Sequence, residues 1–226
     1  MLKELLTIFR KDSGLDQAFR RSYEMIDITK DMFLKAKRTL RETDTTELDT
    51  SVYEQDKKIN KYQKEVRKDV LQHLSIAGVD RLSSGLTLVS IIIDIERIGD
   101  YTKNILELAE NYKAKLHAGN GEEDLAKVEK AVLETFDHLR FILENTDEEA
   151  AVKLIREYLW VNPLCDKHIV AQIREEDKSI SGGRSVTVAL YFRYLKRINS
   201  HLRNITTSVS RPFHKIGFVS KKHLKG

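Results

Sequence analysis

Three acidic residues, Asp94, Glu96 and Asp100, stand in a segment that is otherwise apolar enough for a core helix. Glu96 and Asp100 are four positions apart, so a helix places them one above the other on a single face. Two like charges on a half-buried face repel each other and lose hydration. A bound cation such as Mg²⁺, Mn²⁺ or Fe³⁺, which prefers oxygen ligands, would remove this cost. The alternative is that the acids pair with Arg or Lys on a neighbouring helix or face water.

A second pair of oxygen-bearing side chains lies forty residues upstream. Asp56 and Asn60 are again four positions apart, on a predicted helix whose inward positions include Ile59. Two helices would then each offer an oxygen pair to one shared cation. Gly99, between the two downstream acids, would let backbone or solvent approach closely because it has no side chain.

Apolar residues recur at helical spacing along most of the chain, and no segment alternates like a strand. The sequence therefore predicts six helices, with turn or capping residues between them. We expect them over residues 15–40, 48–74, from the 78–85 break to about 117, 125–143, 147 to about 179, and from the SGGRS segment at 181–185 to 210. The fifth is expected to bend or break near Pro163.

The six predicted helices form two sets of three. Residues 94–105, DIERIGDYTKNI, align with residues 194–205, YLKRINSHLRNI, at a constant offset of 100, with identities that include Arg97 with Arg197 and Asn104 with Asn204. Upstream segments also correspond in order, which indicates an internal repeat. The interval from the upstream Asp to the motif is about ten residues shorter in the second copy, so we expect its fifth and sixth helices to be shorter.

The second copy lacks the acidic motif. Lys196 and Ser200 replace Glu96 and Asp100 there, while Asp166 remains at the position of Asp56. The second copy therefore cannot hold a cation in the same way. We expect the Lys196 ammonium to pair with Asp166 as an intramolecular substitute for the ion.

Composition restricts the class of protein. The 226 residues include two prolines and one cysteine, 33% are charged, and the formal net charge is +4. This composition is typical of a mainly helical protein with no internal disulfide. No run reaches the length of a membrane span, and the N-terminus does not look like a signal peptide, so we expect a cytosolic protein. Five Lys or Arg and no acid occupy residues 211–226, a basic tail that alone gives weak support for nucleic-acid binding.

The chain resembles the PhoU family of phosphate-uptake regulators. The resemblance rests on residues 94–105, which are similar to the family's acidic E(D)xxxD motif in its LERIGDHAxNI setting, on DKKIN at residues 56–60, and on the tandem three-helix repeat. It covers roughly residues 15–210. The missing acidic motif in the second copy departs from the family pattern and makes two equivalent sites doubtful.

The resemblance implies an all-α fold that repeats an antiparallel three-helix bundle. The repeats would span residues 15–118 and 119–210, after a lead-in helix over 1–14 and before the basic tail over 211–226. It also implies a metal ion, which would be iron, zinc, manganese or magnesium. The implied ligands are Asp56, Asn60, Glu96 and Asp100, with Asp94 and Asn104 as additional candidates.

The implied function is regulation of phosphate uptake and phosphate-starvation signalling without catalysis. The chain would be a cytoplasmic adaptor, peripheral to the inner face of the membrane, whose partner is a phosphate transporter or a sensor kinase. A homodimer is compatible with this role, and no nucleic-acid partner is expected.

Two other classes of function are open. A ferritin-like carboxylate metalloenzyme needs Glu-x-x-His pairs, and none of the seven histidines has a Glu three residues before it. A helical lipid-surface or transporter-associated adaptor unrelated to phosphate would use the amphipathic segment at residues 1–12 together with the basic tail.

Overall fold

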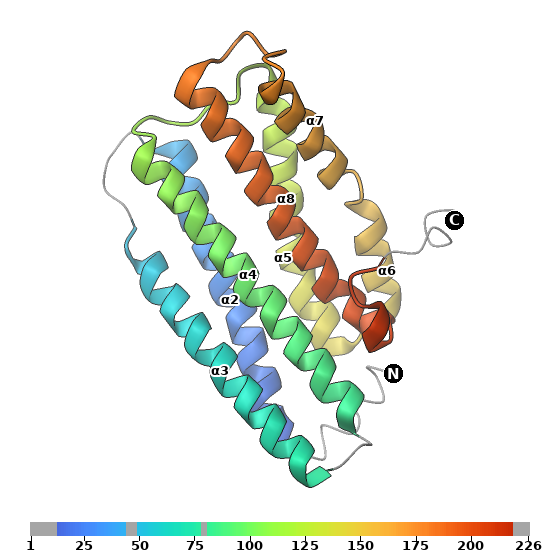
Figure 1. The fold of residues 1–226 in the computed structure, drawn as a ribbon. Coiled ribbons are helices and arrows are strands. Elements are labelled where there is room, and N and C mark those ends of the chain that lie inside the picture. The colour runs from blue at the N-terminus through green and yellow to red at the C-terminus, as the bar shows by residue number, and fades with distance from the viewer. Residues whose placement is uncertain (1–12, 44–48, 78–80, 219–226) are drawn as a thin grey trace.

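The computed structural model describes residues 13–43, 49–77 and 81–218. These residues contain seven α-helices and two short 3₁₀ helices, joined by loops (Figure 1). The first bundle contains α2 (Ser13–Glu42), α3 (Ser51–Ala77) and α4 (Leu82–Asn111). The second contains η2 (Gly119–Gly121), α5 (Glu122–Asn145), α6 (Glu148–Glu157), α7 (Val161–Ile173) and α8 (Gly182–Ser210), and η3 (Phe213–Lys215) follows. The all-α class is confirmed, and these described residues contain no strand.

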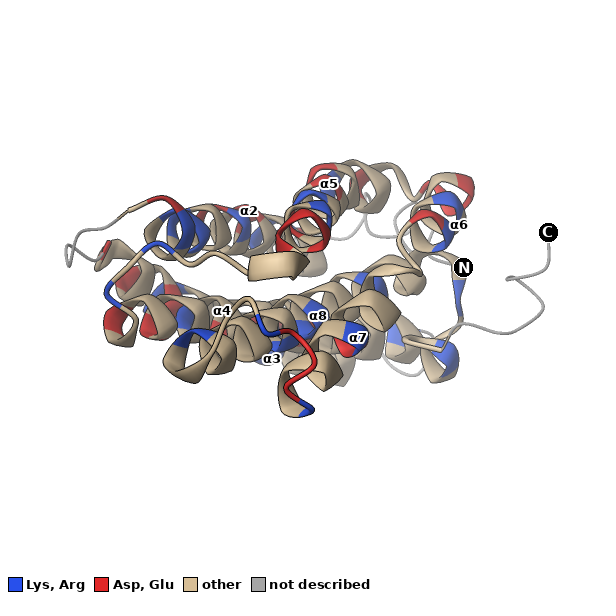
Figure 2. Ribbon diagram, turned by 90° about the horizontal axis from the view of Figure 1, so that it is seen from above, with Lys and Arg blue, Asp and Glu red and all other residues tan. Residues whose placement is uncertain are grey.

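The helices lie in two layers. Helices α3, α4, α8 and α7 lie side by side in one layer, and α2, α5 and α6 lie behind them (Figures 1 and 2). The two bundles meet mainly through α4 and α8, the third helices of the two repeats. The acidic motif on α4 is thus carried by a helix that packs against α2, α3 and α8.

One side of α4 is fully buried because its apolar residues recur at helical spacing. Leu88, Ile92 and Ile95 are completely inaccessible to solvent, and they belong to a core that runs through both bundles. Burial of each such side chain contributes about 1.5–3 kcal/mol. This buried face fixes the rotation of α4, and therefore the direction in which its acids point.

Gly85 allows α3 and α4 to pack closely near the start of α4. A Cβ at this position would lie 2.8 Å from Leu74 Cδ1 and 2.9 Å from Val70 Cγ1, so a larger residue would require these side chains to shift. The sequence interpretation of residues 78–85 as one break was therefore wrong at its end, because α4 already begins at Leu82. Residues 78–80 lie outside the described residues.

Two other helix ends differ from prediction. Helix α4 ends at Asn111 rather than near His117, because Tyr112 is extended and the chain crosses to α2, where the Leu116 amide bonds to the Leu40 carbonyl at 2.9 Å. The predicted fifth helix is divided into α6 and α7, with the interruption just before Pro163, as expected, but α7 ends at Ile173 rather than near residue 179.

The two repeats differ in length only in part as predicted. Helices α6 and α7 have 10 and 13 residues against 27 in α3. The predicted shortening of the sixth helix was wrong, because α8 has 29 residues and α4 has 30. Helix α8 thus has nearly the length of α4, and the two pack against each other at the junction between the bundles.

The terminal segments are described only in part. The predicted lead-in helix falls largely on residues 1–12, outside the described residues, and residues 13–14 belong to α2. In the predicted tail, the amide of Gly217 donates to Thr207 Oγ1 at 2.7 Å, so this part folds back on α8. Gly217 has φ +82°, a conformation that favours glycine.

A buried polar network joins the bundles at Arg41 of α2. Its guanidinium donates from Nε to Glu129 of α5 at 2.9 Å, and it also contacts Glu122 and the Leu116 carbonyl. Tyr191 of α8 donates to the same Glu129 oxygen at 2.7 Å. Burial and the nearby Glu129 charge raise the pKa of Tyr191 well above its usual value. The network is satisfied from three helices, and it therefore fixes how the bundles dock.

Candidate functional site

Glu96 and Asp100 of α4 lie on the side of this helix where α3 comes close. Gly99 marks this approach: a Cβ there would lie 3.3 Å from Ile59 Cδ1 and 3.9 Å from Asp56 Oδ1. A side chain at Gly99 would crowd Ile59, while Asp56 lies at ordinary contact distance. The Asp56 carboxylate shares Lys103 with Asp100, and its charge acts on Glu96. The structure brings these three acids together as one group, hereafter the acidic cluster.

Lys103 of α4 supplies a positive charge to the acidic cluster. Its Nζ donates to Asp56 Oδ2 at 3.3 Å and to Asp100 Oδ1 at 3.5 Å. Burial by itself would lower the pKa of Lys103, but the charges of Asp56 and Asp100 outweigh it, so the pKa is raised. Lys103 therefore stays protonated and joins the two helices as an ion pair.

Asn60 holds the Asp56 carboxylate in place. Its Nδ2 donates to the backbone oxygen of Asp56 at 3.1 Å and to Asp56 Oδ2 at 3.3 Å. The amide group is thus oriented with its donor toward Asp56. The expected oxygen pair on α3 exists, but Asn60 acts in this structure as a donor that positions the acid.

Glu96 is the least compensated acid of the cluster. Its side chain is only 16% exposed, and the nearest cation is Arg97 Nε at 3.8 Å. Burial raises the pKa of Glu96, and the charges of Asp100 and Asp56 raise it further against the opposing charges of Arg97 and Arg67. The repulsion anticipated between Glu96 and Asp100 is therefore present in the folded chain.

Asp94 points away from the acidic cluster, toward α8. Its Oδ1 lies 2.7 Å from His201 Nδ1 and accepts a hydrogen bond from Asn204 Nδ2 at 3.2 Å. Tyr101 stacks on the His201 ring, with 5.8 Å between the ring centroids. Two residues of separation from Glu96 put Asp94 on another face of the helix. Asp94 is thus a buried contact between the bundles, and the structure does not bring it to the other candidate ligands.

Asn104 lies on the same line of α4 as the motif but makes no hydrogen bond to it within the part of the chain that the structure describes. It is half-buried one turn beyond Asp100 on α4. Among the described residues, no hydrogen bond joins Asn104 to Asp56, Glu96 or Asp100. The structure thus gathers Asp56, Asn60, Glu96 and Asp100, leaves Asn104 at the edge of this group and places Asp94 elsewhere.

The fit of a metal ion can be judged from the donor types and from Lys103. Across the described ranges, no three His, Cys, Asp or Glu side chains are arranged so as to hold a metal ion. Carboxylate and amide oxygens are nevertheless the donors that hard cations prefer. The Lys103 ammonium already occupies a position shared by Asp56 and Asp100. The donors therefore fit a cation in type, and Lys103 is the stand-in with which an ion would compete.

The second bundle replaces the acidic cluster by a direct ion pair. Lys196 Nζ of α8 lies 2.6 Å from both carboxylate oxygens of Asp166 on α7, which confirms the predicted pair. At the position of Asp100, Ser200 accepts a hydrogen bond from Asn162 Nδ2 at 2.9 Å. At the position equivalent to the acidic cluster, the second bundle thus has the Asp166 carboxylate, which already has Lys196 as its cation partner.

Sequence reasoning missed Lys103, which belongs to the acidic cluster, and His201, which contacts Asp94 away from it. Lys103 lies three positions after Asp100 and seven after Glu96, so the helical spacing alone would have placed it on the same face. His201 carries no comparable signal, because its partner Asp94 is more than a hundred residues away and belongs to the other bundle.

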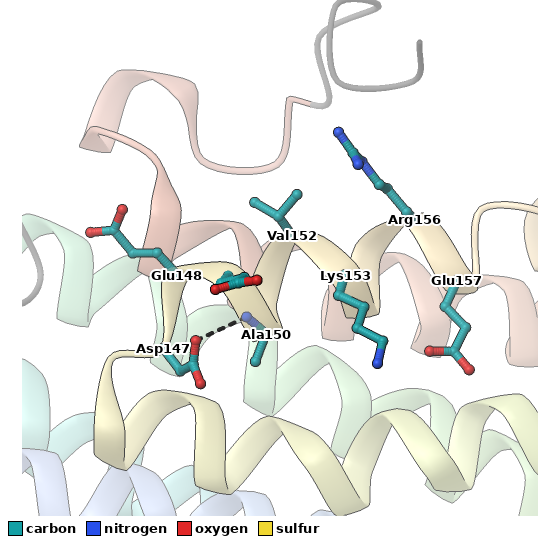
Figure 3. Close-up of a pocket in the computed structure, with 8 residues that line it drawn as sticks. Asp147, Glu148, Ala150, Val152, Lys153, Arg156 and Glu157 are labelled. Atoms are coloured by element: carbon teal, nitrogen blue, oxygen red, sulfur yellow. Dashed lines mark hydrogen bonds between the residues drawn. The ribbon is translucent and has the colours of Figure 1, made fainter. Parts of the chain in front are cut away.

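Other features of the described chain offer no convergent chemistry. A surface hollow of about 1090 Å³ follows α6, where Asp147 caps the helix by accepting from the Ala150 amide (Figure 3). Lys153 and Arg156 point in different directions there (Figure 3). Cys165 is fully buried, and burial raises its pKa to about 12, so it is a packed thiol.

Residues 23–109, which include the acidic cluster and most of the first bundle, match the family model described as the PhoU domain. This part of the chain is therefore a PhoU domain. The resemblance inferred from the sequence is confirmed, and the acidic cluster lies inside the matched region. No curated protein matches the chain.

Solved PhoU structures share the fold of both bundles. The crystal structure of PhoU from Pseudomonas aeruginosa superimposes with a TM-score of 0.75 and 19% identity, covering 88% of this chain and 96% of that one. The phosphate transport system regulatory protein PhoU from Streptococcus pneumoniae gives a TM-score of 0.72 at 18% identity, covering 88% and 94%. The PhoU-like arrangement therefore includes the second bundle, beyond the region that the family model matches. None of the described helices is long and apolar enough to cross a membrane.

Proposed function

We propose that this chain regulates phosphate uptake and phosphate-starvation signalling as a non-enzymatic adaptor. The observation that carries the proposal is the acidic cluster, which lies in the PhoU domain and on the layer formed by α3, α4, α8 and α7. The S. pneumoniae structure with this fold is described as a phosphate transport system regulatory protein. The proposed partner is a phosphate transporter or a sensor kinase, at the cytoplasmic face of the membrane.

The proposed cofactor is a metal ion held by Asp56, Asn60, Glu96 and Asp100. Iron, manganese and magnesium suit an all-oxygen donor set better than zinc, which more often takes nitrogen or sulfur ligands. The ion would supply positive charge that offsets the repulsion between the acids. Binding requires Lys103 to leave the position it shares between Asp56 and Asp100, and Asn60 to turn its amide oxygen toward the site.

Metal analysis of protein purified without added ions tests the proposed cofactor. Glu96→Ala combined with Asp100→Ala should remove essentially all bound metal, because the second bundle has Lys196 and Ser200 at these positions. Glu148→Ala combined with Glu149→Ala is a matched control on the exposed start of α6. Retention of most of the metal by the first variant would rule out this assignment.

The adaptor role is tested in cells. Deletion of the chain should change phosphate accumulation or phosphate-responsive expression, and the tagged protein should co-purify with a phosphate transporter or a sensor kinase. If the ion forms part of the docking surface, the Glu96→Ala, Asp100→Ala variant should weaken this association while it retains its melting temperature. Normal phosphate handling after deletion, with no membrane partner recovered, would contradict the proposed function.

A further inference from the structure

Four lysines form a line along the side of α3 that faces away from the bundle. Lys57, Lys61, Lys64 and Lys68, hereafter the lysine stripe, are all exposed and follow one another at intervals of four, three and four residues. These intervals put them on one face of a helix. Arg67 is also exposed beside the stripe. The outer side of α3 is therefore a continuous cationic surface.

The acids of α3 do little to neutralise the second half of this surface. Glu65 and Asp69 turn toward α2, where both contact Arg21; the Arg21 Nε to Glu65 Oε2 distance is 3.3 Å. Lys61 is 3.9 Å from Glu65, and Lys57 pairs with Glu54 at 2.8 Å. Within the described chain, Lys64 and Lys68 have no ion-pair partner, whereas the charge of Arg67 acts on Glu96 of the acidic cluster.

The cationic surface continues into exposed aliphatic side chains at the end of α3. Leu71 is 69% exposed and Ile76 is 90% exposed, and Leu82 at the start of α4 is also exposed. Contact of large apolar side chains with water is unfavourable, and this free-energy cost is relieved only when another surface covers them. Cations and aliphatic groups thus occur together at one end of the first bundle.

Helix α7, the counterpart of α3 in the second bundle, carries no equivalent line of lysines. Helix α7 has 13 residues against 27 in α3, and Lys167 is the only lysine on it. The lysine stripe is therefore a feature of the first repeat and does not follow from the shared fold.

We propose that the lysine stripe and the aliphatic end of α3 dock on an anionic lipid surface. Lysine is a compact charge on a flexible chain, which suits the headgroup phosphates of a fluid surface, whereas base recognition uses the planar fork of Arg. The stripe contains no aromatic residue on which a base could stack. Leu71 and Ile76 would enter the boundary between headgroups and acyl chains, as apolar side chains of interfacial helices do. This inference does not rest on the proposed role in phosphate uptake.

Vesicle sedimentation with the full chain tests the proposal. The protein should bind vesicles that contain phosphatidylglycerol and should bind pure phosphatidylcholine vesicles far less. Added salt should release it from the anionic vesicles, because salt screens the electrostatic attraction. Lys61→Gln, Lys64→Gln and Lys68→Gln together should weaken binding by about 100-fold, since each cation near an anionic surface contributes about fivefold. Leu71→Ser with Ile76→Ser should weaken binding with little change in its salt dependence.

A matched variant controls for net charge. Lys127→Gln, Lys130→Gln and Lys153→Gln remove the same charge from the exposed surfaces of α5 and α6, and this variant should bind like the wild type. Each variant should keep the wild-type melting temperature, because the substituted side chains are exposed. Three results would each overturn the proposal: equal binding by the stripe and control variants, equal binding to neutral vesicles, or loss of binding only when residues 211–226 are removed. If the protein bound a DNA duplex but did not bind the vesicles, this result would also overturn the proposal.

Discussion

Lys103 Nζ lies 3.3 Å from Asp56 Oδ2 and 3.5 Å from Asp100 Oδ1, so one ammonium joins α3 to α4 at the acidic cluster. A metal ion at the same carboxylates would have to displace this ammonium. The stability of the metal-free bundle and its affinity for metal are therefore expected to change in opposite directions when Lys103 is altered.

Lys103→Met should lower the free energy of unfolding of the metal-free protein by about 1–3 kcal/mol, because partly buried carboxylates lose their cation. The same variant should bind Mn²⁺ or Mg²⁺ more tightly than the wild type. Urea denaturation and calorimetric titration measure the two quantities. Lys64→Met, which removes an exposed lysine without an ion-pair partner in the described chain, should change neither. Weaker metal binding by Lys103→Met would contradict competition at the acidic cluster.

Glu96→Gln should stabilise the metal-free protein at neutral pH, by less than about 1 kcal/mol because the site is partly solvated. Burial and the charge of Asp100 raise the pKa of Glu96 in the folded state. The folded chain therefore holds the Glu96 proton more tightly than the unfolded chain, and ionisation costs stability. This cost is absent below the ordinary pKa of Glu and develops as pH rises through the raised pKa.

Thermal unfolding of wild type and Glu96→Gln across this pH range measures the difference between them. The two curves should coincide at the acidic end and separate toward neutral pH. Saturating metal should reverse the order, because the ion stabilises the ionised carboxylate that Gln lacks. A Glu96→Gln variant that is less stable than the metal-free wild type at neutral pH would contradict the raised pKa.

Asp94→Ala should destabilise the protein without reducing its metal content. The substitution leaves His201 and Asn204 without their carboxylate partner at the junction of the bundles, and an unsatisfied buried polar group costs about 1–3 kcal/mol. Chemical denaturation and metal analysis of one preparation separate the two effects. Loss of metal at unchanged stability would instead show that Asp94 is a ligand.

Lys196→Met should barely change stability, although the Lys196 to Asp166 ion pair is well formed. Asp166 is 51% exposed and Lys196 is 22% exposed, so solvent screens the pair and its contribution is about 0–1 kcal/mol. Urea denaturation would detect a larger effect. A loss well above this range would mean that the Lys196 side chain contributes through packing of its methylene groups.

The spacing of residues along the sequence predicted where the helices lie, but it did not predict correctly where several of them begin and end. The spacing of apolar residues places a helix correctly because burial of one face dominates its energy. Gly85 is an example of failure: from the sequence it is a helix breaker, but it is a packing residue in α4 because Leu74 and Val70 occupy the space of a side chain. The end of α4 at Asn111 depends on a hydrogen bond between Leu116 and Leu40, which no local signal encodes.

The sequence alone determined the helical class, the repeat, the family resemblance, the oxygen-rich motif and the pairing of Lys196 with Asp166. Each of these depends on residue type and on spacing along a helix or between two copies of a pattern. Tertiary structure alone decided that Lys103 neutralises part of the acidic cluster and that Asp94 faces His201. It also decided that Glu65 and Asp69 turn toward Arg21 and leave the lysine stripe exposed. These contacts depend on the rotation and docking of helices, which the burial of many apolar side chains sets together.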